Sequence, residues 1–158
     1  MNMKSAMATA WVAAALALAP APALAAFDAD PLEDLAVRNT DFQRGRAAVE
    51  ARDWSNAIKS LTAAEKRTPG NADIHNLLGF AYRNSGQLEP ALKHYQRALQ
   101  IDPRHRGAHE YIGEAYLMSG NPAKAEEHLA TLKRICPIRC DERDDLDRKI
   151  ASYKSGKK

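Results

Sequence analysis

The chain has 158 residues, with 23 basic and 20 acidic side chains, so its formal net charge at pH 7 is +3. This balance provides no strongly basic stripe and therefore argues against nucleic acid as a partner. Beyond Ala25 no apolar run is long enough to span a membrane, and about 133 residues suit one domain.

The N-terminal segment up to Ala25 (1-25) is typical of a secretory signal peptide. Lys4 supplies the positive start, an apolar run extends from Ala6 to Ala19, and a small-residue triplet ends at Ala25. This run is shorter than the roughly 20 apolar residues that a membrane-spanning helix needs, which favours cleavage over anchoring. We predict cleavage after Ala25 and export, to the periplasm or the cell exterior.

An internal repeat organises the chain from Arg38 onward. Residues 26–37, which are acidic and weakly patterned, form a predicted N-terminal arm. Four columns match in three successive copies without an insertion, and such self-similarity is the signature of a repeat architecture. We therefore predict repeats at residues 38–71, 72–105 and 106–139. The columns are Gly45/Gly79/Gly113, Ala57/Ala91/Ala125, Leu61/Tyr95/Leu129 and Pro69/Pro103/Pro137.

Each copy is predicted to be a pair of helices, and the second copy shows this most clearly. Apolar residues recur at helical spacing from Ile74 to Tyr82 and again from Leu88 to Leu99. The segment Asn84-Ser85-Gly86 separates the two stretches, and Pro103 ends the second because proline lacks the amide that a helix needs. Gly79 has no side chain, so the two helices are expected to approach closely there.

These residues resemble the tetratricopeptide repeat family. The resemblance implies an all-α fold, an α-solenoid of three helix-turn-helix repeats. The first copy matches less well, with Ala48 at a usually aromatic position and Arg52 where the later copies have glycine. The matching residues are Leu78-Gly79, Tyr82, Ala91, Tyr95, Ala98 and Pro103 in the second copy, and Ile112-Gly113, Tyr116, Ala125, Leu129 and Pro137 in the third.

The stretch after the repeats is predicted to be a C-terminal capping helix at residues 140–154, followed by a tail at 155–158. Leu146, Ile150 and Tyr153 lie on one stripe and the rest is mostly charged, as the outer face of a terminal cap requires.

The resemblance also implies a concave binding groove lined by the first helix of each repeat. Arginines stand at one end of this groove and glutamates at the other. We therefore expect a partner protein or peptide segment that carries both charges and an apolar anchor. The expected groove residues are Phe42, Arg46, Asp73, Asn76, Phe80, Arg83, Glu110, Glu114 and Leu117.

Some members of the family grip the C-terminal carboxylate of a peptide with lysine, arginine and asparagine side chains. Only one of the matching positions here is basic and two are acidic, so this grip is not expected. The matching positions hold Phe42, Arg46, Leu77, Glu110 and Glu114.

The two cysteines, Cys136 and Cys140, flank a turn before the capping helix. An even cysteine number in an exported chain favours a structural disulfide. A reactive thiol pair remains an alternative, because Cys140 at a helix N-terminus would have a lowered pKa. Metal binding by this pair is a further alternative that would need two more ligands.

Other catalytic or metal motifs are absent from the sequence. His75 and His109 occupy equivalent positions in successive copies, as do His94 and His128. We expect the first pair to pack within the repeats and the second to be solvent-exposed, without a metal or another cofactor.

The sequence thus predicts a non-catalytic periplasmic adaptor or assembly factor, not an enzyme. One alternative is a thiol-redox or metal-handling helper that uses Cys136 and Cys140. Another is a self-assembling scaffold that associates through its first repeat.

Overall fold

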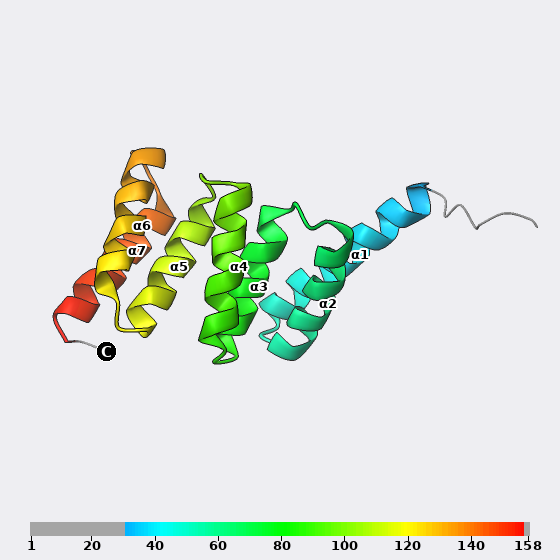
Figure 1. Cartoon of the computed structure of the whole chain (residues 1–158), viewed down its shortest axis with the longest axis horizontal. Helices are drawn as coiled ribbons and strands as arrows, with labels where there is room; N and C mark the ends of the chain where they lie inside the picture. Colours follow the sequence, from blue (N-terminus) through cyan, green and yellow to red (C-terminus); the bar gives the residue numbers. More distant parts are fainter. Residues whose placement is uncertain (1–30, 157–158) are drawn as a thin grey trace, which may run out of the picture.

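The computed structural model describes residues 31–156, with side-chain surroundings from residue 40 onward, and these residues form seven α-helices and no strand. The predicted signal peptide and its cleavage site lie outside the described residues. Figure 1 shows the helices in one continuous row. Their bounds are α1 Pro31–Glu50, α2 Trp54–Arg67, α3 Ala72–Asn84, α4 Leu88–Ile101, α5 Arg106–Met118, α6 Pro122–Ile135 and α7 Asp141–Lys154.

The first helix is longer than the sequence predicted. It begins at Pro31, so most of the segment predicted as an arm at residues 26–37 is helical. Proline is favoured at this first helical position, because its fixed φ suits the helix and its missing amide would have no partner there.

Local capping residues set most of the helix starts. The side chains of Asp53, Asn71, His105 and Asn121 each accept a hydrogen bond from the backbone amide three residues later. These bonds satisfy amides that the helix itself leaves without a partner.

The turns inside the repeats require a left-handed backbone. Gly86 and Gly120 provide it with φ angles of 81° and 74°, and Arg52 adopts the same region at 57° in the first repeat. Glycine accepts this conformation readily, whereas arginine does so at a cost in free energy. The missing glycine of the first repeat therefore leaves the backbone path unchanged but makes this turn more strained.

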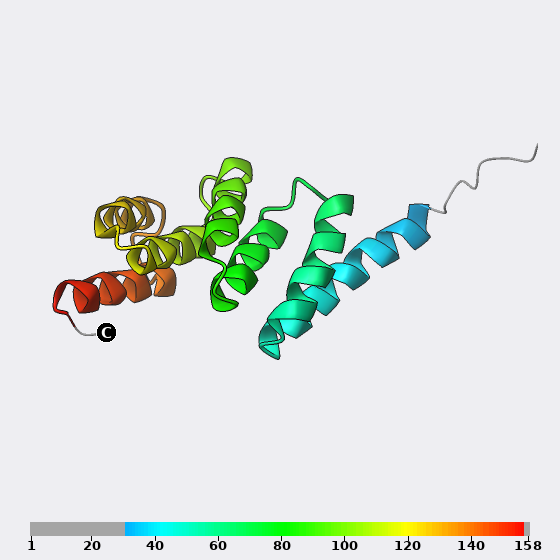
Figure 2. The ribbon, with the colours of Figure 1, turned by 60° about the horizontal axis from the view of Figure 1, so that its bottom comes forward.

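The helices form two layers that bend the molecule. The inner helices contact one another in the order α1, α3, α5 and α7. Among the described residues, the outer helices α2, α4 and α6 contact only inner helices and not one another. Because the inner layer is closer together than the outer one, the inner layer forms the concave side. Figure 2 shows the same row of helices turned toward the reader.

Small residues allow the helices to pack closely, as the sequence predicted. A β-carbon on Gly45 would lie 2.6 Å from the Leu61 side chain, and one on Gly79 would lie 2.6 Å from the Tyr95 ring. Gly113 differs, because it faces Leu146 of α7 rather than its own repeat. The capping helix α7 thus packs against α5 at the glycine column.

The connection between α6 and α7 is closed by a disulfide between Cys136 and Cys140, whose Cα atoms are 5.8 Å apart. Arg143 in the first turn of α7 donates hydrogen bonds to the carbonyl oxygens of Cys136 and Pro137, at 3.2 and 2.9 Å. The end of α6 and the start of α7 are therefore held by covalent and polar links together. Within the part of the chain that the structure describes, no helix combines the length and the apolar character needed to cross a bilayer.

Candidate functional site

The centre of the concave side is an ion pair between two inner helices. Arg83 of α3 pairs with Glu114 of α5, and their side chains are 9% and 11% exposed. The Arg83 guanidinium also lies 5.4 Å from the ring centres of both Phe80 and Tyr111. Such a desolvated cation between two rings and a carboxylate is strongly held. Arg83 and Glu114, which the sequence predicted at opposite ends of the groove, instead neutralise each other.

Phe80 is the middle member of an aromatic row. Its ring centre is 6.0 Å from that of Trp54 and 5.0 Å from that of Tyr111, and the side chain is half-buried. The row connects α2, α3 and α5. Phe80 therefore contributes mainly to repeat packing and offers only part of its surface to a partner.

The acidic end of the predicted groove is covered by the capping helix. Lys149 of α7 pairs with Glu114, and its Nζ lies 3.9 Å from Glu110 Oε1. Glu110 is 7% exposed. Burial, reinforced by the charge of Glu114 and opposed by Lys149, raises the pKa of Glu110 to about 8. The expectation that Glu110 faces a partner is wrong, because α7 packs over it.

The remaining predicted residues are divided between the surface and the interior. Arg46 and Asp73 are exposed, and Asp73 accepts a hydrogen bond of 3.1 Å from His105 Nε2. Phe42 packs against the core of the first repeat and is half-buried. Asn76 is buried next to Gly107 at the start of α5, and so cannot line an open groove as predicted.

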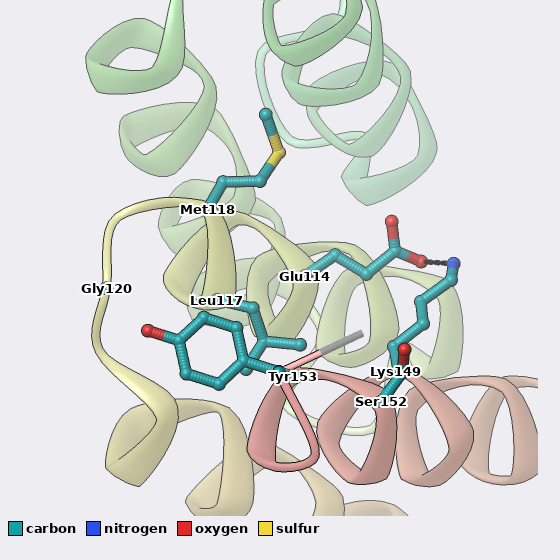
Figure 3. A pocket seen from close by; sticks show the side chains of 8 residues that line it. Glu114, Leu117, Met118, Gly120, Lys149, Ser152 and Tyr153 are labelled. Carbon is teal, nitrogen blue, oxygen red and sulfur yellow. Dashed lines mark hydrogen bonds and ion pairs between the residues drawn. The ribbon is translucent and has the colours of Figure 1, made fainter. Parts of the chain in front are cut away.

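An open groove remains at the C-terminal end of the concave side. It has a volume of about 810 Å³ and lies between the end of α5 and the last turns of α7. Leu117, predicted as a groove residue, forms part of its wall although it is 9% exposed. Figure 3 shows Tyr153 on one side of the opening and the Glu114–Lys149 pair on the other. The lining residues are Glu114, Leu117, Met118, Gly120, Lys149, Ser152, Tyr153 and Gly156.

Three residues of the concave side were missed as site residues from the sequence: Tyr111, which contacts Arg83, and Lys149 and Tyr153, which line the groove. Lys149 and Tyr153 are four residues apart in one helix, so both side chains lie on the same face. That spacing is a usable signal, but the sequence does not reveal that α7 turns this face toward α5. The packing of Leu146 against Gly113 and the pair of Lys149 with Glu114 fix it.

Histidines pair within the second and the third repeat. Nδ1 of His75 lies 3.4 Å from Nδ1 of His94, and the same atoms of His109 and His128 are 2.9 Å apart. His94 and His128 are therefore partly buried, and the expectation of solvent exposure is wrong. The repeat places its second helix against its first at these positions, so the two imidazoles of one copy meet.

Profiles described as tetratricopeptide repeat match residues 42–105 and 85–135 of the chain, and together they span most of the described helices. The chain belongs to the tetratricopeptide repeat family.

Among curated proteins, the human protein O-mannosyl-transferase TMTC3 is 31% identical over 85 residues, which are 54% of this chain. The match spans only 9% of that protein.

Solved structures share the fold at low identity. The TPR2B domain of yeast Sti1, in its complex with pHsp70, has a TM-score of 0.71 at 19% identity, and the match covers 77% of this chain and 98% of that one. The TPR domain of Arabidopsis OM64 gives 0.69 at 17% identity, covering 76% and 98%.

Proposed function

We propose that this chain is a non-catalytic adaptor or assembly factor that binds a segment of a partner protein on its concave side. The groove between α5 and α7 would receive an apolar side chain of that segment. We further propose that the protein acts after export, in the periplasm or outside the cell.

The observation that carries this proposal is the exposed apolar rim of the groove. Met118 is 61% exposed and Tyr153 is 42% exposed, and both line the same opening. Exposed apolar residues that gather around a concavity are typical of protein interaction sites, because a partner removes them from water.

Charge is expected to orient the partner rather than to hold it. Lys149 and Glu114 already pair with each other at the side of the groove. A partner carboxylate would therefore compete with Glu114 for Lys149, and such exchange contributes more to specificity than to affinity.

The structural relatives support peptide recognition in general terms. The yeast Sti1 domain is in complex with pHsp70, and the second TPR domain of human RPAP3 is in complex with an HSP70 peptide. The carboxylate grip does not suit this chain, because Glu110 and Glu114 stand at two of its five positions. An internal segment or a helix with an apolar anchor suits the groove better.

The disulfide is assigned a structural role in this proposal. Cys140 is 1% exposed and Cys136 is 6% exposed. Thiol–disulfide exchange requires access of an attacking thiolate to a sulfur atom, so this burial disfavours redox cycling.

Capture of partners from a periplasmic extract tests the proposal. Met118→Asp places a charge on the groove rim, and Ile138→Asp makes the same change at an 81% exposed site in the loop before α7. A partner retained by the wild type and by Ile138→Asp, but lost by Met118→Asp, supports the groove. Equal capture by all three chains would show that another surface binds it.

A further inference from the structure

One acidic and two histidine side chains from three consecutive helices meet at the junction of the first and second repeats. They are Glu65 of α2, His75 of α3 and His94 of α4. Glu65 Oε1 lies 3.4 Å from Nδ1 of His75 and 3.9 Å from Nδ1 of His94, and the two Nδ1 atoms are 3.4 Å apart. Three potential ligand atoms therefore surround one point.

The surrounding contacts orient both imidazoles. Nε2 of His75 lies 3.0 Å from the carbonyl oxygen of Pro69 and must donate to it, because a carbonyl only accepts. In the neutral ring Nδ1 of His75 then carries a lone pair, which faces Glu65 and His94. The Tyr82 ring stacks on His94 with a centroid distance of 5.3 Å and an angle of 12°. The imidazole of His94 is thus also held in a fixed orientation.

We propose that Glu65, His75 and His94 form a binding site for a divalent first-row transition metal ion, with Zn²⁺ as the representative ion. The point in the plane of the three ligand atoms that is equidistant from them lies about 2.1 Å from each, which is the bond length that Zn²⁺ forms with imidazole nitrogen and carboxylate oxygen. The bond from His75 to the Pro69 carbonyl is the kind of outer contact that usually holds a metal-bound histidine.

The site leaves a position for a fourth ligand. His75 is 5% exposed, whereas His94 and Glu65 are 21% and 28% exposed. The ion would therefore be closed off on the His75 side and open toward the solvent on the other. Water or a partner side chain would complete its coordination there.

The third repeat provides an internal comparison. His109 and His128 occupy the equivalent positions, and Nε2 of His109 likewise donates to the carbonyl oxygen of Pro103 at 3.1 Å. The place equivalent to Glu65 is taken by Leu99. The two Nδ1 atoms are 2.9 Å apart, which is an ordinary hydrogen-bond length. A histidine pair alone is thus satisfied by its own hydrogen bond, whereas Glu65 of the first repeat adds a carboxylate to the pair in the second repeat.

Metal binding at this place would join the first repeat to the second, because α2 belongs to one and α3 and α4 belong to the other. An ion that binds the folded state and not the unfolded one raises the melting temperature in proportion to the logarithm of its concentration. The ion would thereby stabilise the repeat junction, independently of the groove between α5 and α7.

Isothermal titration with Zn²⁺ tests the proposal on the untagged, oxidised full chain after treatment with a chelator. We expect one equivalent to bind and the melting temperature to rise. Glu65→Leu copies the third repeat, and Glu65→Gln keeps the side-chain size. Both variants should fold and weaken Zn²⁺ binding by about 100-fold or more, since loss of an outer contact alone costs 10–100-fold.

Two further variants test whether Zn²⁺ binds at this place. Leu99→Glu should create a second site at His109 and His128, so that it binds two equivalents. Cys136→Ser with Cys140→Ser should leave the titration unchanged. The proposal is overturned if the wild type shows neither Zn²⁺ binding nor a higher melting temperature, or if Glu65→Leu binds Zn²⁺ as the wild type does. A folded Leu99→Glu chain with a single equivalent would equally contradict it.

Discussion

The ring of Tyr95 packs against Gly79 so closely that a β-carbon on residue 79 would lie 2.6 Å from two ring carbons. Tyr95 is fully buried, so its ring cannot move aside without disturbing the core. We predict that Gly79→Ala lowers the free energy of unfolding by about 1–3 kcal/mol through overpacking. Urea unfolding followed by circular dichroism measures this loss.

Gly70→Ala is the matched control, because a β-carbon there would have no atom within 4 Å. We expect it to change stability by less than about 1 kcal/mol, with a small gain if the unfolded chain becomes less flexible. Equal losses at residues 70 and 79 would show that the contact with Tyr95 does not govern the effect.

The two arginines predicted for the groove should respond differently to truncation. Arg83→Ala removes the partner of the nearly buried Glu114, and breaking such a pair costs about 3–5 kcal/mol. Lys149 also pairs with Glu114 and should keep the loss at the lower end of this range. Arg46→Ala, at an exposed site, should stay within about 0.5 kcal/mol. Thermal unfolding of both variants distinguishes a structural arginine from an exposed one. An Arg83→Ala variant as stable as the wild type would contradict the ion-pair assignment.

Glu110 should make stability fall as the pH rises. Burial raises its pKa to about 8 in the folded state, so the folded chain keeps a proton that the unfolded chain releases near pH 4.5. Its contribution is therefore complete below pH 4.5 and is lost progressively up to about pH 8. We expect Glu110→Gln to be more stable than the wild type at pH 8 by at least about 1 kcal/mol. If urea unfolding gives the same difference at pH 5 and pH 8, Glu110 is ionised in the folded state.

His128 should act in the opposite direction in acid. Burial, together with the neighbouring His109 and Lys124, lowers its pKa to about 4, from 6.5. Its contribution is present above pH 6.5 and is lost as the pH falls toward 4. His128→Gln, which stays neutral, should flatten the acid side of the stability curve. A His128 ring that titrates near 6.5 by NMR would refute this assignment.

The disulfide should stabilise the chain modestly. Closing a loop of five residues contributes about 2 kcal/mol through the entropy of the unfolded chain. Replacing both Cys136 and Cys140 by serine should therefore lower the free energy of unfolding by about that amount. Comparison of oxidised and reduced wild type gives a second measure, and a loss confined to the serine variant would point to the substitutions themselves.

The fold was predictable because its determinants are local and repeated. The break at Asn84 and Ser85 and the stop before Pro103 correspond to the ends of α3 and α4 in the structure. The helical period and the glycine column need no information on distant residues. The start of α1 was missed because residues 31–37 precede the first repeat copy, and the helical spacing of Leu32, Leu35 and Ala36 covers little more than one turn.

The site was less predictable because it depends on contacts between repeats. The sequence places Arg83 and Glu114 on successive first helices but does not show that their side chains meet. It also does not reveal that α7 directs Lys149 toward Glu110, since this contact joins two helices that are not adjacent in sequence. The meeting of Glu65 with His75 and His94 was missed for the same reason, as it combines three helices.

Each described helix contacts only helices that are next to it or next but one in the order along the chain. The molecule is therefore held together by contacts between neighbouring elements, as repeat proteins are. Opening can therefore proceed from one end without disrupting the other. Both ends contain a non-glycine residue with positive φ, Arg52 and Arg139, but only the C-terminal loop is closed by a disulfide, and Lys149 also binds α7 to α5. Proteolysis under native conditions is thus expected to shorten the protein from its N-terminal side and to leave the stretch from α3 to α7 as the resistant fragment.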